Sequence, residues 1–232
     1  MHVLIGTSGF QYKAWRGDFY PARCADSDML THYASQLASV ELNNTFYRMP
    51  KPAVVAGWAA RVPEDFRFAI KAPQRITHRL RLKDCGEAVA FLLDSLSALG
   101  ARQGPILFQL PPNFKVDLER LGGCLAAVPE GVPVAFEFRH ESWRDETVYA
   151  ALRDRNAAFC IADVDGDDLE RPWPVTSDFG YLRLRRDGYT SEELSRVADR
   201  IRAQPWERVH AYFKHEQTGP ALARELTQLC QR

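Results

Sequence analysis

Charged and amide side chains stand two residues apart near the ends of several short apolar segments. In the stretch SVELN, Glu41 and Asn43 share one face of a strand, and the apolar residues share the other. The stretch AFEFR repeats this pattern with Glu137 and Arg139. Successive side chains of a strand point to opposite faces, so the two members of each pair project from the same side. We therefore expect both carboxylates, each with a polar neighbour, to face a common interior.

Other apolar segments end in polar residues as well. These are Lys71 in RFAIK, Gln109 in ILFQL, Asp163 in AFCIAD, Arg183 and Arg185 in YLRLR, and Lys214 in AYFK. Because a buried charge is costly unless it is paired, these groups should partner one another or a ligand. The alternative is an ionic plug that only fills the interior, since structural ion-pair networks also bring such groups together.

These residue types suit acid–base chemistry on a small anionic or carbonyl-bearing metabolite. Glu137 or Glu41 would act as general base, and Asp163 joins them as a catalytic candidate. Arg139 would orient the base or hold a phosphate or carboxylate group. Lys71 would instead form a Schiff base if its neighbours lower its pKa. We expect a lyase, isomerase or hydrolase that needs no cofactor.

Polar and aromatic residues that follow the apolar segments add a binding rim. The substrate-binding candidates are Ser8, Asn43, Asn44, Tyr47, His78, Gln109, Arg139, His140, Trp143, Arg183, Lys214 and His215. Aromatic residues often line ligand sites. The alternative for Trp15, Phe19 and Trp143 is that their rings fix a long loop to the body of the protein.

Three other functions remain open at this point. A metal-dependent hydrolase or isomerase would use Glu41, Glu137, Asp163, His215 and Glu216, but the surrounding cations and the lack of an HExxH motif argue against a metal. In a glycosidase, two carboxylates would stand roughly 5–9.5 Å apart. A non-catalytic protein would serve as a ligand sensor, or would bind nucleic acid through QYKAWRGDFYPAR and ITHRLRLK. The stretch GTSG is too short for a dinucleotide or Walker motif, so neither NAD nor ATP is implied.

Eight short apolar segments alternate with segments of helical periodicity. They cover residues 3–7, 39–43, 66–71, 105–110, 133–139, 158–163, 180–185 and 209–214. Helix starts are indicated by Asp117, by the capping-box pair Thr190 and Glu193, and by Pro220. Strict alternation predicts parallel strands, and eight such units predict a TIM-like (β/α)8 barrel. Residues 1–232 would form one domain, and an open doubly wound sheet is the alternative architecture.

Composition limits the partners and the location. Lys plus Arg and Asp plus Glu both number 30, so the formal net charge is zero and nucleic acid is disfavoured as a partner. The five cysteines are scattered and form no zinc or redox motif. We expect a cytoplasmic protein, because the sequence shows neither a signal peptide nor a long apolar span. Its partner would be a small anionic molecule.

Five ordered motifs together resemble the DUF72 family of YecE-like proteins. They are GTSGFQYKAWRGDFYP, VELNNTFYRMP, FRFAIKAPQRITH, ILFQLPPNF and AFEFRHESW. The resemblance runs from Ile5 to the final helix, and it implies a TIM-barrel-like fold of uncharacterised biochemical function.

The chain departs from the common family pattern at two places. Many members resemble RLHG after the seventh strand and FNND after the eighth. This chain instead has RLRR at residues 183–186 and FKHE at residues 213–216. Both replacements add cationic groups near one rim, which favours a more anionic ligand.

Overall fold

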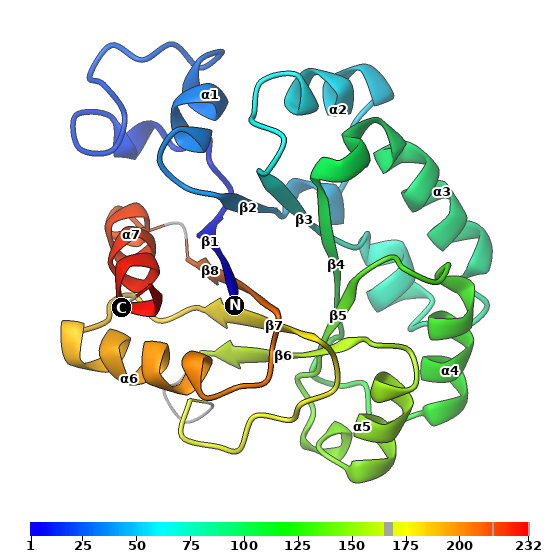
Figure 1. Ribbon diagram of the computed structural model, residues 1–232. Helices are drawn as coiled ribbons and strands as arrows, with labels where there is room; N and C mark the ends of the chain where they lie inside the picture. Colours follow the sequence, from blue (N-terminus) through cyan, green and yellow to red (C-terminus); the bar gives the residue numbers. More distant parts are fainter. Residues whose placement is uncertain (165–168, 215, 232) are drawn as a thin grey trace.

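The computed structural model describes residues 1–164, 169–214 and 216–231. Eight parallel strands form a closed barrel in sequential order, and helices surround it (Figure 1). The strands are β1 (His2–Ser8), β2 (Ser39–Leu42), β3 (Arg67–Lys71), β4 (Gln103–Gln109), β5 (Val134–Glu137), β6 (Ala158–Asp163), β7 (Phe179–Leu184) and β8 (Arg208–Phe213). The predicted TIM-like (β/α)8 barrel is confirmed, and the open-sheet alternative is wrong.

The outer helices follow the strands in chain order. They are α1 (Met29–Ala34), α2 (Pro52–Ala59), α3 (Gly86–Leu96), α4 (Leu118–Ala127), α5 (Glu146–Arg153), α6 (Ser191–Arg202) and α7 (Gly219–Cys230). Short turns of helix lie between them: η1 (Lys13–Trp15), η2 (Asn44–Phe46), the π-helix η3 (Arg75–Arg79), η4 (Ser97–Arg102) and η5 (Glu141–Trp143).

The expected helix starts are confirmed. Asp117 accepts a hydrogen bond from the backbone of Arg120 at the start of α4. Thr190 and Glu193 form the complete capping box of α6, and Pro220 lies in the first turn of α7. These caps satisfy backbone donors that a helix leaves unpaired at its first turn.

Two separate layers of side chains stabilise the barrel. The larger one packs the outward-facing apolar residues of the strands against the helices. The smaller one fills the lower barrel interior with Ala69, Leu107, Ala135, Ala158, Cys160, Phe179, Tyr181 and Tyr212. Above this inner layer, towards the carboxyl ends of the strands, the interior becomes polar. The alternation in the sequence therefore places the apolar layer and the polar site on the same inner face.

A tyrosine hydroxyl enters the seam between β1 and β2. Tyr33, on α1, donates a hydrogen bond to the carbonyl of Ser39 at 3.0 Å and accepts one from the backbone of Thr7 at 2.8 Å. Gly6 lies against this contact, and a Cβ atom there would stand 1.8 Å from the Ser39 carbonyl oxygen and 2.8 Å from the Tyr33 hydroxyl. Only glycine lets the two strands and the hydroxyl approach so closely.

We predict that Gly6→Ala lowers the free energy of unfolding by about 3 kcal/mol, because a methyl group would have to displace backbone. Gly57→Ala is the matched control, since Gly57 lies within α2 and nothing stands within 4 Å of its added Cβ. This control should be neutral or stabilising by up to about 1 kcal/mol, through helix propensity. Urea denaturation measures the free energies of unfolding of both variants. Equal changes in the two variants would refute the proposed role of Gly6.

Candidate functional site

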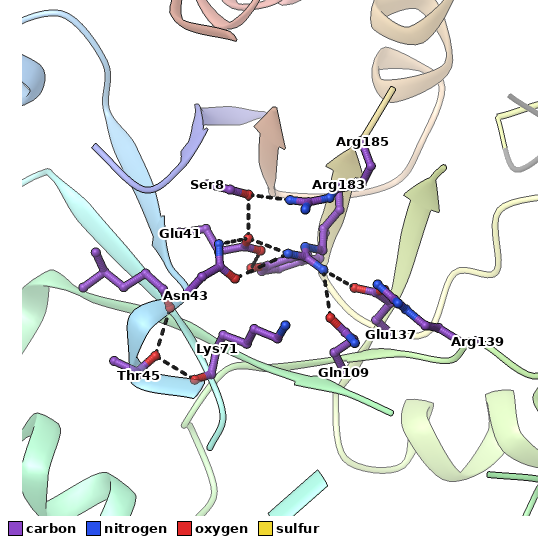
Figure 2. A network of polar contacts seen from close by, with 12 residues as sticks. Ser8, Glu41, Asn43, Thr45, Lys71, Gln109, Glu137, Arg139, Arg183 and Arg185 are labelled. Carbon is purple, nitrogen blue, oxygen red and sulfur yellow. Dashed lines mark hydrogen bonds and ion pairs between the residues drawn. The ribbon is translucent and has the colours of Figure 1, made fainter. Parts of the chain in front are cut away.

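Arg183 stands at the centre of the polar interior. Its side chain projects from β7 and is only 2% exposed. One terminal nitrogen lies 2.9 Å from Oε1 of Glu41, on β2, and the other lies 2.5 Å from Oε2 of Glu137, on β5 (Figure 2). A single guanidinium therefore joins carboxylates from opposite parts of the barrel wall. The predicted convergence of these three side chains is confirmed.

Further hydrogen bonds surround the Glu41 carboxylate. Its Oε1 accepts hydrogen bonds from Ser8 at 2.7 Å and Asn43 at 3.1 Å, and its Oε2 accepts one from Tyr181 at 2.8 Å. Arg185 in turn donates to the Ser8 hydroxyl at 3.0 Å. Ser8 and Tyr181 are inward-facing strand residues, as the alternation predicts, and Asn43 and Arg185 directly follow β2 and β7. Glu41 is thus a fully partnered buried ion.

The second carboxylate, Glu137, has fewer partners. Besides Arg183, it accepts a hydrogen bond from Nε of Arg139 at 2.9 Å. Gln109 is adjacent and accepts a long hydrogen bond of 3.4 Å from the same Arg183 nitrogen that contacts Glu137. Arg139 is 40% exposed, so it connects the buried network to the solvent at the barrel mouth.

Both carboxylates are held in their ionised form. Burial acts to raise the pKa of Glu41, but the charges of Arg183 and Arg185 outweigh it and lower the pKa to about 2. The pKa of Glu137 is also lowered, because burial is outweighed by the charges of Arg183 and Arg139. A carboxylate held ionised so firmly is a weak proton acceptor. This electrostatic setting does not favour either residue as the general base.

Lys71 has a different environment. Its amine lies 4.2 Å from the ring centroid of Phe46, and within the described part of the chain no carboxylate lies at ion-pair distance from it. Burial, and then the charge of Arg183, lower the pKa of Lys71 to about 8. Figure 2 shows its side chain pointing towards the network around Arg183. Lys71 is therefore an amine of lowered basicity, beside a buried ionic cluster.

The loops after β2 and β3 supply the adjacent rim. His78 lies on η3, packs edge-on against Phe46 at 5.0 Å between ring centroids, and shares a hydrogen bond with Thr77. Burial and the charge of Lys71 lower the pKa of His78, which favours the uncharged form of its ring. Asn44 and Tyr47 are exposed at the rim, and Tyr47 is 76% exposed.

A cavity of about 340 Å³ opens beside the network, over the ends of β5 and β6. Glu137 and Arg139 line it together with Cys160 and Ala162, which are inward-facing residues of β6. His140 also lines it, although the Nδ1 atom of this residue accepts a hydrogen bond from the backbone of Ser142. This cavity is the space in which a small molecule would meet the buried carboxylate.

Asp163 lies outside the site, contrary to expectation. It pairs with Leu184 across the β6–β7 ladder and so shares the outward face of that strand. Its carboxylate accepts hydrogen bonds from Arg186 and Tyr189, both at 2.8 Å. In AFCIAD the inward residues are Cys160 and Ala162, so the alternation itself points Asp163 towards the helices. The expectation that Asp163 would join the inner cluster is wrong.

Two further candidates also lie away from the centre. Trp143 is fully buried, stacks on Phe138 and donates to the carbonyl of Phe114, so its ring cannot touch a ligand. The Trp143 ring instead fixes its loop to the body of the protein, which is the alternative role that the sequence left open for it. Lys214 is inward-facing by register, but its amine binds Asp187 and Glu216 at the rim. His215 lies outside the described residues.

Arg185 contacts the Glu41 cluster through Ser8, as its parity with Arg183 predicts. Other site residues are not predicted from the sequence. Tyr181 contacts the same cluster, and its shared parity with Arg183 is a signal for it. Phe46 packs on Lys71, and nothing in the sequence indicated this contact. Arg144 and Arg171 line the cavity from loops, where no periodicity exists to predict the direction of a side chain.

The described residues do not form a metal site. Among them, no group of three or more His, Cys, Asp and Glu side chains could hold one. Glu41 and Glu137 bind Arg183 instead, and Asp163 binds Arg186. In the same part of the chain, no helix has the length and apolar character needed to cross a bilayer.

The family follows from a comparison with known proteins. The family described as "Protein of unknown function DUF72" matches residues 4–232. The chain belongs to the DUF72 family. Two curated DUF72-like relatives match part of the sequence. The UPF0759 protein YecE of Escherichia coli (strain K12) is 33% identical over 149 residues, which cover 62% of this chain and 55% of that protein.

The UPF0759 protein YunF of Bacillus subtilis is 31% identical over 159 residues, which cover 63% of this chain and 54% of that protein. The chain thus spans about half the length of the curated relatives it matches. The resemblance expected from the motifs is confirmed.

Solved DUF72 structures share the barrel. A DUF72 family protein from Thermotoga maritima superposes with a TM-score of 0.85 and 25% identity over 100% of both chains. One from Enterococcus faecalis gives a TM-score of 0.79 at 18% identity and covers 99% of this chain and 96% of its own. The second likeness concerns the fold alone. DUF72 is a family of unknown function, so the chemistry of the site must be argued from its geometry.

We predict that Arg183→Met costs about 3–5 kcal/mol of unfolding free energy at pH 7, because it leaves two buried carboxylates without their main partner. The folded pKa of Glu41, about 2, lies below its usual value. Its contribution is therefore present at neutral pH and is lost as the pH falls towards 2. The difference in unfolding free energy between the variant and the parent protein, referred to below as the gap, should therefore decrease as the pH falls.

Denaturation curves from pH 7 down to pH 2 measure this gap, because the contribution of Glu41 is lost only below its usual pKa of 4.5. Arg196→Met is the control, since Arg196 is an exposed residue of α6 that pairs with Glu192. It should change stability by less than about 0.5 kcal/mol. A gap that stays constant with pH would contradict an electrostatic origin of the effect.

We predict that Lys71→Met raises the free energy of unfolding at pH 7 by about 2 kcal/mol, with allowance for partial exposure. The folded pKa of about 8 is below the usual 10.5 for lysine, so folding penalises the charged amine. The penalty is complete below pH 8 and disappears as the pH rises towards 10.5. The stability that Lys71→Met gains over the parent protein should therefore decrease between pH 8 and pH 10.5.

Denaturation at pH 7 and pH 10 tests this, with the exposed Lys115→Met as control. If the advantage is the same at both pH values, desolvation of the amine is not its cause.

Proposed function

We propose that this protein is an enzyme acting on a small carbonyl-bearing anion, with Lys71 as the amine that attacks the carbonyl. One observation carries the proposal: Lys71 is a half-buried amine with a pKa near 8 and no carboxylate partner among the described residues. Lysines that form Schiff bases are activated by desolvation or by nearby cations. Lys71 experiences both.

The pKa determines how much of the reactive form is present. Only a neutral amine can attack a carbonyl carbon, and a group of pKa about 8 is roughly one-tenth neutral at pH 7. A lysine with its usual pKa of 10.5 would be neutral in less than about one molecule in a thousand. The surroundings of Lys71 therefore enrich the nucleophile by more than two orders of magnitude.

The covalent step is balanced without a cofactor. The nitrogen lone pair of Lys71 forms a bond to the carbonyl carbon, and the carbonyl oxygen takes up protons. It leaves as water, so that amine, carbonyl and one proton give an iminium ion and one water molecule. That proton comes from the solvent, and the imidazole ring of His78, on the adjacent loop, would relay it. The iminium then acts as an electron sink for bond cleavage or isomerisation at the neighbouring carbon.

The ionic cluster would orient the substrate, while its carboxylates stay ionised. Lys71, Arg139, Arg183 and Arg185 face the mouth, against two carboxylates, Glu41 and Glu137. The surplus of positive charge favours an anionic ligand, and an arginine fork matches a carboxylate or phosphate group. Glu137 would contribute by fixing Arg139, rather than as the base. Ser8, Asn43 and Gln109 then act through the charged groups that they contact.

We place this activity in the cytoplasm. All five cysteines are free thiols, and three of them are buried. Free thiols persist in a reducing compartment.

We predict that sodium cyanoborohydride traps a covalent adduct on Lys71 when the protein is incubated with small 2-oxo acids or phosphorylated aldehydes. Peptide mass spectrometry locates the modified residue, and the stoichiometry should approach one per chain for an accepted carbonyl compound. Lys71→Arg keeps the charge but lacks a nucleophilic amine, so the specific adduct should disappear. An equal yield in this variant, or modification spread over exposed lysines such as Lys115, would rule out Lys71 as the nucleophile.

A further inference from the structure

Three arginines from separate elements border the cavity over β5 and β6. Arg139 follows β5, Arg144 follows η5, and Arg171 lies in the segment before β7. The cavity holds about 340 Å³, and its wall also includes Glu137. It is therefore continuous with the Arg183 cluster, at a position away from β3, which carries Lys71.

Each arginine has a contact other than Glu141 before any ligand binds, through the guanidinium in Arg139 and Arg144 and through the backbone in Arg171. Arg139 binds Glu137 at 2.9 Å. The Arg144 guanidinium carbon lies 5.4 Å from the ring centroid of Phe159, a cation–π contact. The backbone of Arg171 is fixed by a 2.7 Å hydrogen bond from Arg200 to its carbonyl. Groups fixed in advance lose little freedom when an anion binds.

The two arginines from the loops share one exposed carboxylate. Both oxygens of Glu141 accept hydrogen bonds from one nitrogen of Arg171, at 3.0 and 3.2 Å, and Oε2 also lies 3.9 Å from Arg144. Glu141 is 72% exposed and Arg171 is 43% exposed. An ion pair so exposed contributes little to stability, so a competing anion can displace it at small cost.

We propose that this cavity is the subsite for a phosphate group of the substrate, and that Glu141 occupies the position of that phosphate when no ligand is bound. Three arginines that line one cavity offer donors for all three terminal oxygens of a phosphate, more than the two oxygens of a carboxylate require. The inference deepens the proposed function and rests on it: the substrate would carry its carbonyl at Lys71 and a phosphate towards β5 and β6.

If Glu141 competes with phosphate for the arginines, removing its charge should strengthen phosphate binding. A purely structural ion pair would not have this effect. Glu141→Gln removes the competing charge but keeps the shape of the side chain, so the affinity for inorganic phosphate should rise by about fivefold. Arg171→Met should lower the affinity by a similar factor. The double variant should show a smaller gain over Arg171→Met, because Glu141 then competes only for Arg144. Isothermal titration calorimetry of the full chain at fixed ionic strength measures all of them.

Two controls distinguish a specific phosphate site from a general effect of charge on anion binding. Glu192→Gln removes another exposed carboxylate, one that pairs with Arg196, and it should leave phosphate affinity unchanged. Acetate, which has only two oxygens, should bind more weakly than phosphate. An unchanged or lower phosphate affinity in Glu141→Gln, or acetate binding as tightly as phosphate, would overturn the proposal.

Failure here is distinguishable from failure of the Schiff-base chemistry. Lys71→Arg keeps the positive charge, so it should bind phosphate like the parent protein even though it forms no adduct. Loss of phosphate binding in Lys71→Arg would count against the cavity as the phosphate site. An absence of adduct with normal phosphate binding would count against Lys71 alone.

Discussion

A single guanidinium buried between two carboxylates determines how the upper barrel interior is organised. Arg183 is 2% exposed, and Glu41 and Glu137 are at most 1% exposed. Taking three ions out of water is expensive, and their mutual attraction compensates only when geometry and additional hydrogen bonds are good. Ser8, Asn43 and Tyr181 supply these bonds to Glu41. The cluster therefore fixes the orientation of at least five strands at their carboxyl ends, where barrel enzymes place their sites.

This arrangement explains why Lys71 has lowered basicity. Both carboxylates nearby are already engaged by arginines, which hold their charge more firmly than lysine and present a planar fork to two partners at once. Lys71 is left with an aromatic ring and a positive neighbourhood, so its neutral form is favoured. In a cluster with one more carboxylate, the same lysine would be an ordinary ion-pair partner. The scarcity of negative charge thus gives the amine its reactivity.

The sequence predicts the barrel and much of the inner cluster, because alternation along a strand depends only on backbone geometry. Glu41, Lys71, Glu137 and Arg183 were placed correctly on that basis. The expectation for Asp163 is wrong because lying at the end of a strand does not determine the face from which a side chain projects. Asp163 stands two residues after Ile161 and therefore shares its outward face. Loop residues such as Trp143 and Arg171 follow no period, and their directions depend on packing that sequence patterns do not encode. Which of the clustered side chains pair with one another also depends on distances in the folded structure, and sequence patterns do not give these distances.

The view that the cluster is only an ionic plug explains part of the interior. Glu41, Glu137 and Arg183 satisfy one another, and they would do so in a protein with no ligand at all. That view does not explain Lys71, whose desolvated amine opposes folding without a compensating partner among the described residues. Proteins retain such destabilising groups where function needs them, because a group optimised for stability would be paired or apolar. Arg139 also reaches the solvent at the barrel mouth, where a plug that only fills the interior would have no need of a cation. The surplus charge, rather than the buried pairs, is the part of this site that points to a ligand.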